Sequence, residues 1–370
     1  MSAHAKLSAS GASRWLACPG SVSAEKGMSD RSSPAAHEGT CAHELAEIVL
    51  VNGGTCFDWV GKTLIENNEW TVDQEMAEHV QEYVDYVLSF KGEHAYEQRV
   101  DFSDWVPEGF GTSDAIIIDG DTLHAIDLKF GKGLRIFAEE NPQAMLYCLG
   151  AYSDYGMIYD IKRVVVHIVQ PRLDHIDTWE ISLPDLLKWG EWASQRAEMC
   201  LEPDAERVPG NAQCLWCKAK ATCPALQQHT QKVIMSDFDE IDSPTPAHLT
   251  DDQLKAALDS KKLIVSWLDA VEQHIKERVE KGGFPGYKLV AGRSLRNWGD
   301  SEKAAKALKD LLGEESYKKT LISPAQAEKA LGKKDAVKIK DLIVKPEGKP
   351  TLAPETDKRP SITITADDFD

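Results

Sequence analysis

The chain has 370 residues, of which 42% are hydrophobic, enough for one large folded domain or two ordinary ones. Its formal net charge of -18 argues against a protein that coats nucleic acid without specificity, although an acidic enzyme can still carry a local basic channel. The sequence contains neither an apolar run long enough to span a membrane nor an apolar N-terminal leader, so we expect a cytoplasmic protein without a membrane partner.

The first part of the chain is predicted to be mainly helical. Residues 6–17 form a short helix that ends at Cys18-Pro19-Gly20, and residues 22–36 are expected to be a loop. The following helix carries His43, and residues 71–90 are an amphipathic helix. A single helix histidine is more often a surface or core residue than a ligand, so His43 alone indicates no site.

A β-hairpin over residues 111–129 is the central prediction. Two apolar strands are joined at Asp119-Gly120-Asp121, where glycine permits a tight turn. Asp114 lies near the start of the first strand, and Asp127 and Lys129 lie on one face near the end of the second. Antiparallel pairing brings these three side chains together.

This trio has a chemical interpretation. Two adjacent carboxylates repel each other, and a divalent cation such as Mg²⁺ relieves the repulsion while also binding phosphate oxygens. A neighbouring ammonium group can orient water or stabilise developing charge, so the set fits metal-dependent phosphodiester hydrolysis. The alternative is a solvated hairpin whose acidic and basic residues pair across the strands. Glu97, in the strand before the hairpin, is a candidate for an indirect role through a water molecule.

The remaining elements complete an α/β core with a mixed sheet. A helix over residues 141–152 places Gln143 and Tyr147 on one face, because they are four residues apart. Two strands and a helix are predicted at 163–170, 176–183 and 184–201. Basic residues that could offset backbone charge are Lys129, Lys132, Arg135 and Arg172.

Three cysteines are spaced as in a metal site. Cys214, Cys217 and Cys223 form a C-x2-C-x5-C pattern, which in a reducing compartment indicates metal ligands rather than disulfides. A closed site needs a fourth ligand, and Cys18, also followed by proline, is the candidate. The other cysteines are expected to be small packing residues: Cys41, Cys56, Cys148 and Cys200.

The chain changes character after about residue 235. A polar linker leads to a long helix over 249–280, and residues 287–298 are predicted to be a strand or hairpin. Two short helices follow, at 301–312 and 323–331. The tail from residue 345 is expected to be disordered, serving either to solubilise the chain or as a docking peptide.

Taken in order, these motifs resemble the RecB-like branch of the PD-(D/E)XK nuclease superfamily, specifically its iron–sulfur members. The resemblance covers roughly residues 8–228. It rests on Gly39-x3-His43, Gly111-x2-Asp114, Asp127-Leu128-Lys129, Gln143-x3-Tyr147, and one cysteine upstream of a C-x2-C-x5-C-Pro cluster. The whole chain also looks similar to an uncharacterised group of phage and prophage proteins with this nuclease core.

The resemblance implies roles for the matching residues. Asp114 and Asp127 would be carboxylate ligands of Mg²⁺ or Mn²⁺, with His43 and the Leu128 carbonyl completing the metal shell. Lys129 would position the attacking water or stabilise charge.

Two further sets of residues receive roles from the same resemblance. Gln143 and Tyr147 would orient the active site and touch the DNA backbone. The cysteines Cys18, Cys214, Cys217 and Cys223 would hold a [4Fe–4S] cluster that staples the start of the core to its end. Thiolates suit zinc equally well, so a structural Zn²⁺ site is the alternative.

The expected fold is therefore α/β, with a restriction-endonuclease-like core, a mixed central sheet flanked by helices, and a mainly helical C-terminal region. The predicted domains are 1–235, 236–344 and a tail over 345–370. The implied function is a DNA nuclease, most simply an exonuclease, acting in phage or bacterial recombination, replication or repair.

Two other functions stay open at this stage. One is a catalytically silent, metal-stapled DNA-binding or adaptor protein, and the other is a zinc-stabilised protein-interaction module. Candidate partners are DNA that is single-stranded or has free ends, and a phage single-stranded DNA-binding protein, polymerase or helicase.

Overall fold

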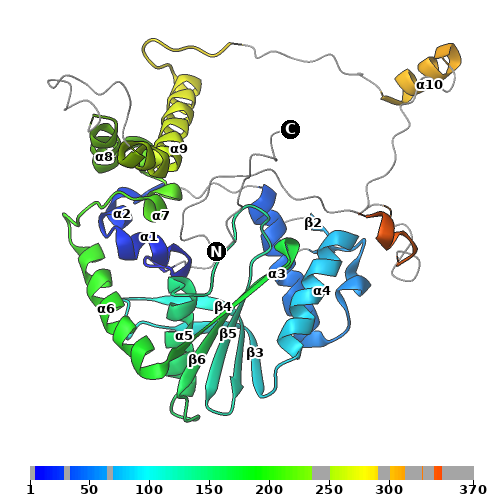
Figure 1. Cartoon of the computed structure of the whole chain (residues 1–370), viewed down its shortest axis with the longest axis vertical. Coiled ribbons are helices and arrows are strands. Elements are labelled where there is room, and N and C mark those ends of the chain that lie inside the picture. Colours follow the sequence, from blue (N-terminus) through cyan, green and yellow to red (C-terminus); the bar gives the residue numbers. More distant parts are fainter. Residues whose placement is uncertain are drawn as a thin grey trace. The chain divides into compact units, whose positions relative to one another are not determined.

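The structure is a computed structural model, and it describes residues 5–28, 34–64, 70–235, 251–290, 301–312, 327 and 337–343 (Figure 1). The chain divides into two units, residues 1–289 and 290–370. The first unit contains a five-stranded sheet with helices packed on both of its faces.

The sheet is mixed, as predicted. Its strand order is β3-β4-β5-β6-β7, and only the β5–β6 pair is parallel. The strands are β3 (Glu93–Asp101), β4 (Phe110–Asp119), β5 (Thr122–Leu128), β6 (Arg163–Gln170) and β7 (His175–Ser182). Helix α5 (Pro142–Tyr155) connects the two parallel strands, which is the crossover that a parallel pair requires.

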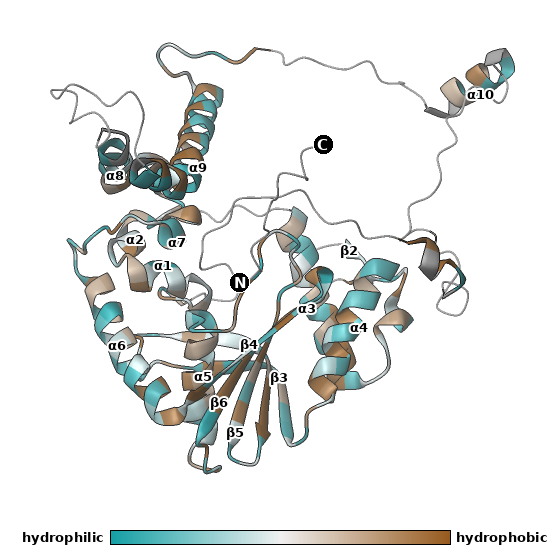
Figure 2. Cartoon of the chain, viewed as in Figure 1, coloured by the Kyte–Doolittle hydropathy of each residue, from teal (hydrophilic) through white to brown (hydrophobic). Residues whose placement is uncertain are grey.

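Two layers of helices cover the sheet (Figure 1). One face packs against α1 (Ala12–Ala17), α5 and α6 (Leu183–Leu201). The other packs against α3 (Pro34–Asn52) and α4 (Gln74–Leu88). The central strands are apolar along most of their length (Figure 2), because both of their faces are buried.

Strand β4 illustrates why this sequence forms a central strand. Ile116 and Ile117 are both nearly inaccessible to solvent, and they belong to the cores on opposite faces of the sheet. Burial of each such side chain contributes about 1.5–3 kcal/mol to folding. The turn after β4 contains Gly120, whose φ of 63° is easily adopted only without a Cβ.

Several short elements complete the first unit. The 3-10 helices are η1 (Ala9–Gly11), η2 (Cys56–Trp59), η3 (Pro171–Leu173) and η4 (Lys220–Thr222). A small hairpin joins β1 (Thr63–Leu64) to β2 (Trp70–Thr71). The short helices are α2 (Gly20–Ala24), α7 (Asn211–Leu215) and α8 (Pro224–Met235).

The predicted loop over residues 22–36 is partly wrong. Helix α2 continues to Ala24, and α3 already begins at Pro34, a residue well suited to the first turn of a helix. Serine and proline occur in the first turns of helices as well as in loops, so the composition of this stretch does not exclude helix ends. Residues 29–33 lie outside the described residues.

The predicted long helix is confirmed as α9 (Asp251–Lys281), which contacts α7, η4 and α8. In the second unit, α10 (Ser301–Leu312) confirms one of the two short helices, and η6 spans Val337–Leu342. Of the predicted strand at 287–298, the structure describes residues 287–290. In this part only Tyr287 forms a β-bridge, an isolated one with Phe284. The tail and most of the predicted helix at 323–331 lie outside the described residues, as does the segment 236–250 that follows the predicted domain boundary.

No helix in the described part of the chain is both long enough and apolar enough to cross a bilayer.

Candidate metal centre

Three neighbouring strands each carry one acidic residue at the same level of the sheet. Tyr96 pairs with Ala115 and Gln98 pairs with Ser113. Glu97 on β3 therefore lies opposite Asp114 on β4. Continuing the β4–β5 register by one residue beyond the Ala115–Ile126 pair places Asp127 opposite Asp114. Residues directly opposite in an antiparallel pair are close neighbours, so the three carboxyl groups form a row.

Glu97 has an unusual backbone conformation. Its φ of 44° is in the left-handed region, inside a strand and for a residue other than glycine. Such a conformation costs on the order of 1–3 kcal/mol and is enriched at functional sites. The regular ladder is interrupted at this residue, while its neighbours Tyr96 and Gln98 remain paired with β4.

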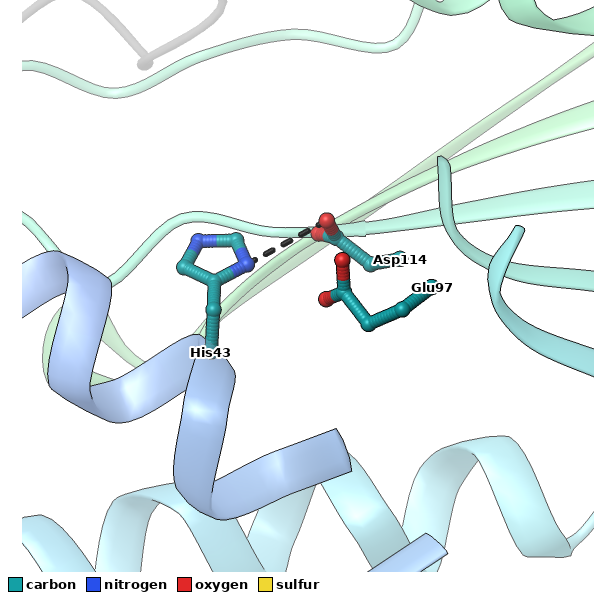
Figure 3. Close-up of side chains that lie close together, drawn as sticks. All are labelled: His43, Glu97 and Asp114. Carbon is teal, nitrogen blue, oxygen red and sulfur yellow. Dashed lines mark ion pairs between the residues drawn. The ribbon is translucent and has the colours of Figure 1, made fainter. Parts of the chain in front are cut away.

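His43 reaches this row from helix α3. Its Nδ1 atom lies 3.2 Å from Oδ1 of Asp114. Ligand atoms of His43, Glu97 and Asp114 all lie within 4.8 Å of one another, so these three residues can hold a metal ion. Figure 3 shows the imidazole and the two carboxyl groups converging, with the ion pair marked by a dashed line.

A second set of contacts links the acidic row to the end of β5 and to α5. Oδ2 of Asp114 accepts a 2.7 Å hydrogen bond from the backbone N–H of Leu128. The Lys129 ammonium lies 2.8 Å from Oδ2 of Asp127 and donates a 3.2 Å hydrogen bond to Oε1 of Gln143. Gln143 in turn donates a 3.2 Å hydrogen bond to the hydroxyl of Tyr147. The hairpin and the first turns of α5 therefore form one continuous polar site.

The electrostatics of the site are those of an acidic cluster that contains internal cations. Burial and then the charge on Asp114 raise the pKa of Glu97 to about 8. Burial alone would lower the pKa of His43, but Asp114 and the other carboxylates raise it to about 9. Burial would raise the pKa of Asp114, yet His43 and Lys129 hold it below its usual value. Without a metal, the imidazolium and a protonated Glu97 thus offset the negative charge that a divalent cation would otherwise neutralise.

Asp127 and Lys129 form a buried ion pair beside these residues. Burial raises the pKa of Asp127, although Lys129 opposes the effect. Burial alone would lower the pKa of Lys129, but Asp127 and Asp114 raise it overall. Lys129 is therefore a cation at neutral pH, available to a substrate phosphate or a water molecule.

Gly111, three residues before Asp114, has a packing role. A Cβ at this position would lie 2.6 Å from Cε1 of Tyr147, so only glycine allows the tyrosine ring to pack against the strand. The Gly111-x2-Asp114 motif thus positions Tyr147 as well as the carboxylate.

We expect Gly111→Ala to destabilise the protein by about 1–3 kcal/mol, because the overpacked ring must move. The measurement is thermal unfolding of the variant beside Gly131→Ala, where an added Cβ meets no atom within 4 Å. In a Tyr147→Ala background the same Gly111→Ala change should lower the stability of the protein much less. An equal cost in both backgrounds would contradict this packing role.

Two members of the predicted basic set are engaged within the protein. The buried guanidinium of Arg172 pairs with Glu38 at 2.8 Å and Glu75 at 3.2 Å, and Lys132 pairs with Glu75 at 2.6 Å. The guanidinium of Arg172 also lies 4.7 Å from the ring centroid of Phe130. Arg172 and Lys132 therefore already have acidic partners on α3 and α4, and their contact with DNA stays a prediction. The sequence did not reveal these partners, which are more than 50 residues away.

All four predicted cysteine ligands line one small cavity, together with Gly20 and Leu226. The backbone N–H of Val208 donates a hydrogen bond to Sγ of Cys18 (3.2 Å), and that of Gly210 donates one to Sγ of Cys214 (3.4 Å). The cavity is therefore lined by residues from both ends of the predicted nuclease core.

The cysteines are not drawn together as a metal cluster in the part of the chain that the structure describes. Their sulfur atoms do not form a group in which all lie within 4.8 Å of one another. Burial raises the pKa of Cys18 and Cys214 and raises that of Cys217 to about 12.

The remaining four cysteines are buried, as expected of packing residues. The main difference from the sequence prediction concerns Glu97, for which the sequence predicts only an indirect role. In the structure a ligand atom of Glu97 lies within 4.8 Å of ligand atoms of His43 and Asp114, whereas Asp127 is paired with Lys129. Whether Asp127 and the Leu128 carbonyl contact a metal remains a prediction.

Comparisons with known proteins identify the family. The model of the family described as "Protein of unknown function (DUF2800)" matches residues 4–360. Among solved structures, one titled "Crystal structure of SSO0001" is similar at 18% sequence identity, over 59% of this chain and 85% of that chain, with a TM-score of 0.27. The family description states no activity, so the resemblance to RecB-like nucleases stays a prediction. Because the family model spans nearly the whole chain, this protein belongs to the DUF2800 family.

Proposed function

We propose that this protein is a metal-dependent DNA nuclease of the restriction-endonuclease-like type. The observation that carries the proposal is the convergence of His43, Glu97 and Asp114 beside the Asp127–Lys129 ion pair. Oxygen and imidazole donors suit Mg²⁺ and Mn²⁺, and a structural scaffold has no need for a strained glutamate that faces an aspartate.

The residues of the site have distinct roles in this proposal. His43, Glu97 and Asp114 would hold the metal, which would supply positive charge to the scissile phosphate and lower the pKa of water. The Lys129 ammonium would hydrogen-bond the attacking water or a phosphate oxygen, and Asp127 would keep it charged and oriented. Gln143 would fix the position of Lys129, and Tyr147 would fix that of Gln143.

The proposal is tested by cleavage of end-labelled linear DNA. Single- and double-stranded substrates are incubated with protein purified without oxygen, with Mg²⁺, Mn²⁺ or EDTA. Cleavage that depends on the metal supports the proposal. Absence of cleavage of every DNA form, by protein that still binds Mn²⁺, would instead favour a DNA-binding or adaptor protein.

Gly39, one turn before His43 on α3, gives a second test. An added Cβ there would meet no atom of the described residues within 4 Å, so no described neighbour requires glycine inside this helix. We expect Gly39→Ala to raise stability by about 0.5–1 kcal/mol, because alanine is the better helix former. If the open space admits the DNA backbone, the same variant should cleave DNA on the order of tenfold more slowly.

The two readouts for Gly39→Ala are thermal unfolding and the rate of cleavage at saturating metal. A gain in stability combined with a loss of activity would locate the substrate beside His43. Unchanged activity would place the DNA elsewhere.

We also infer that the four-cysteine cavity binds a metal cofactor, with a [4Fe–4S] cluster favoured by the resemblance. The cavity fits such a group in two respects: four thiols line it, and backbone N–H groups already point at two of the sulfurs. Its role would be structural, holding Cys18 and residues 205–226 together. Metal analysis and a visible absorption spectrum of anaerobically purified protein distinguish iron–sulfur from zinc. Absence of both metals would reject the cofactor.

A further inference from the structure

The segment that connects β5 to α5, residues 130–141, begins and ends at the candidate metal centre. It follows Lys129 directly and leads to Gln143, and the side chains of these two residues are hydrogen-bonded at 3.2 Å. Its middle part contacts Gln170, His175 and Asp177, so the segment lies at the same end of the sheet as the candidate metal centre.

The segment is braced by side chains of the sheet. The amide of Gln170, a residue only 1% exposed, accepts a 2.7 Å hydrogen bond from the N–H of Ile136 and donates a 3.0 Å bond to the carbonyl of Leu134. Asp177 accepts a 2.8 Å hydrogen bond from the N–H of Ala138. His175 lies 2.9 Å from the carbonyl oxygen of Ile136. These contacts fix the backbone of residues 134–138 against strands β6 and β7.

This bracing exposes apolar side chains. Ala138 is fully buried, whereas Leu134 and Phe137 are each 46% exposed and Ile176, on the adjacent strand β7, is 52% exposed. The ring of Phe137 also packs edge-on against His175, with the ring centroids 5.6 Å apart. The fold therefore holds one aromatic and two aliphatic side chains exposed to solvent, at the same end of the sheet as the proposed nuclease site.

The chemistry of the segment favours bases over phosphates as its ligand. Arg135 is exposed between the apolar residues, but Lys132 is paired with Glu75, and the exposed Glu139 and Glu140 follow before α5. A phosphate-binding surface would be more cationic. Aromatic and aliphatic side chains instead contact the faces of nucleobases, which are accessible only where bases are unstacked.

We propose that Leu134 and Phe137 form a stacking platform for unpaired bases, so that the site acts on single strands or frayed ends rather than on intact duplex. This inference names the substrate class of the proposed nuclease site and rests on that proposal for its reaction. The DNA binding that it predicts can be measured independently of cleavage.

The test is fluorescence anisotropy of a labelled single-stranded oligonucleotide and of a blunt duplex, with Ca²⁺ added to allow binding without cleavage. Phe137→Ala should weaken binding of the single strand by about 5- to 100-fold, as expected when a base loses its aromatic partner, and should leave the weaker binding of duplex unchanged. Leu134→Ala should have a smaller effect in the same direction. Phe137→Trp should retain binding.

Met157→Ala is the matched control, because Met157 is 97% exposed in the connection between α5 and β6, at the opposite end of the sheet. Equal single-strand affinities for wild type, Phe137→Ala and Met157→Ala would overturn the stacking platform even if the protein cleaves DNA. Selective loss in Phe137→Ala would support it even if the protein cleaves nothing, which would reject only the nuclease proposal.

Discussion

Lys129→Met should abolish most metal-dependent DNA cleavage, lowering the rate by about 10²- to 10⁴-fold. Methionine keeps an unbranched apolar stem like that of lysine but removes the terminal ammonium that lies 2.8 Å from Asp127. The variant therefore loses the group that would orient water or stabilise the phosphate, while His43, Glu97 and Asp114 remain in place. The measurement is the initial rate of cleavage of end-labelled DNA with saturating Mn²⁺.

Lys162→Met is the control for this experiment. Lys162 pairs with Asp160 and is 61% exposed, just before β6, whose parallel alignment with β5 places it at the other end of the sheet. Its loss should leave the rate within about twofold of wild type, since exposed ion pairs contribute little. A Mn²⁺-dependent rise in melting temperature would show that the site of Lys129→Met is still formed. If that variant bound Mn²⁺ and cleaved DNA at the wild-type rate, the catalytic centre would have to lie elsewhere.

The sequence was sufficient to predict the elements that depend on local pattern. The alternating and continuous apolar runs predicted β4, β5 and β6, and the turn at Gly120 determined which residues of the hairpin face each other. Asp114 and Asp127 could therefore be placed together from the hairpin pattern alone. The same reasoning placed Gln143 and Tyr147 on one side of α5, where their side chains are hydrogen-bonded.

The contribution of Glu97 could not be predicted in this way. No tight turn links β3 to β4, so the sequence does not fix the register that places Glu97 opposite Asp114. Its positive φ is also invisible in the sequence, because glutamate carries no preference for that conformation. The partners of Arg172 were missed for a related reason, since contacts between distant helices and strands follow from tertiary packing alone.

The acidic row also predicts how stability and metal binding depend on pH. In the folded protein, burial and Asp114 raise the pKa of Glu97 from 4.5 to about 8. Between these two values the unfolded chain loses the Glu97 proton while the folded chain keeps it, so folding stability falls as pH rises. At pH 7 the penalty is about 2 to 4 kcal/mol, at roughly 1.4 kcal/mol for each unit.

Glu97→Gln should remove this penalty. The metal-free variant should melt roughly 5 °C or more above wild type at pH 7 to 8 and show little difference near pH 4.5, because glutamine has no proton to lose. Glu82→Gln, at an exposed position on α4, is the control and should change the melting temperature little at any pH. Equal melting temperatures for Glu97→Gln and wild type at pH 7 to 8 would show that the folded protein does not raise the pKa of Glu97.

Addition of Mn²⁺ should make wild type more stable than Glu97→Gln, the reverse of the order without metal. Wild type should gain about 2.7 kcal/mol at a metal concentration of 100 Kd, whereas Glu97→Gln lacks one anionic ligand and should gain far less. Metal binding to wild type should tighten as pH rises from 6 to 9, because the ion displaces protons from Glu97 and from His43, whose pKa is about 9. A carboxyl group that destabilises the metal-free fold and stabilises the metal-bound one is hard to explain by packing alone. That reversal would therefore identify the His43–Glu97–Asp114 cluster as a metal site, whatever reaction it serves.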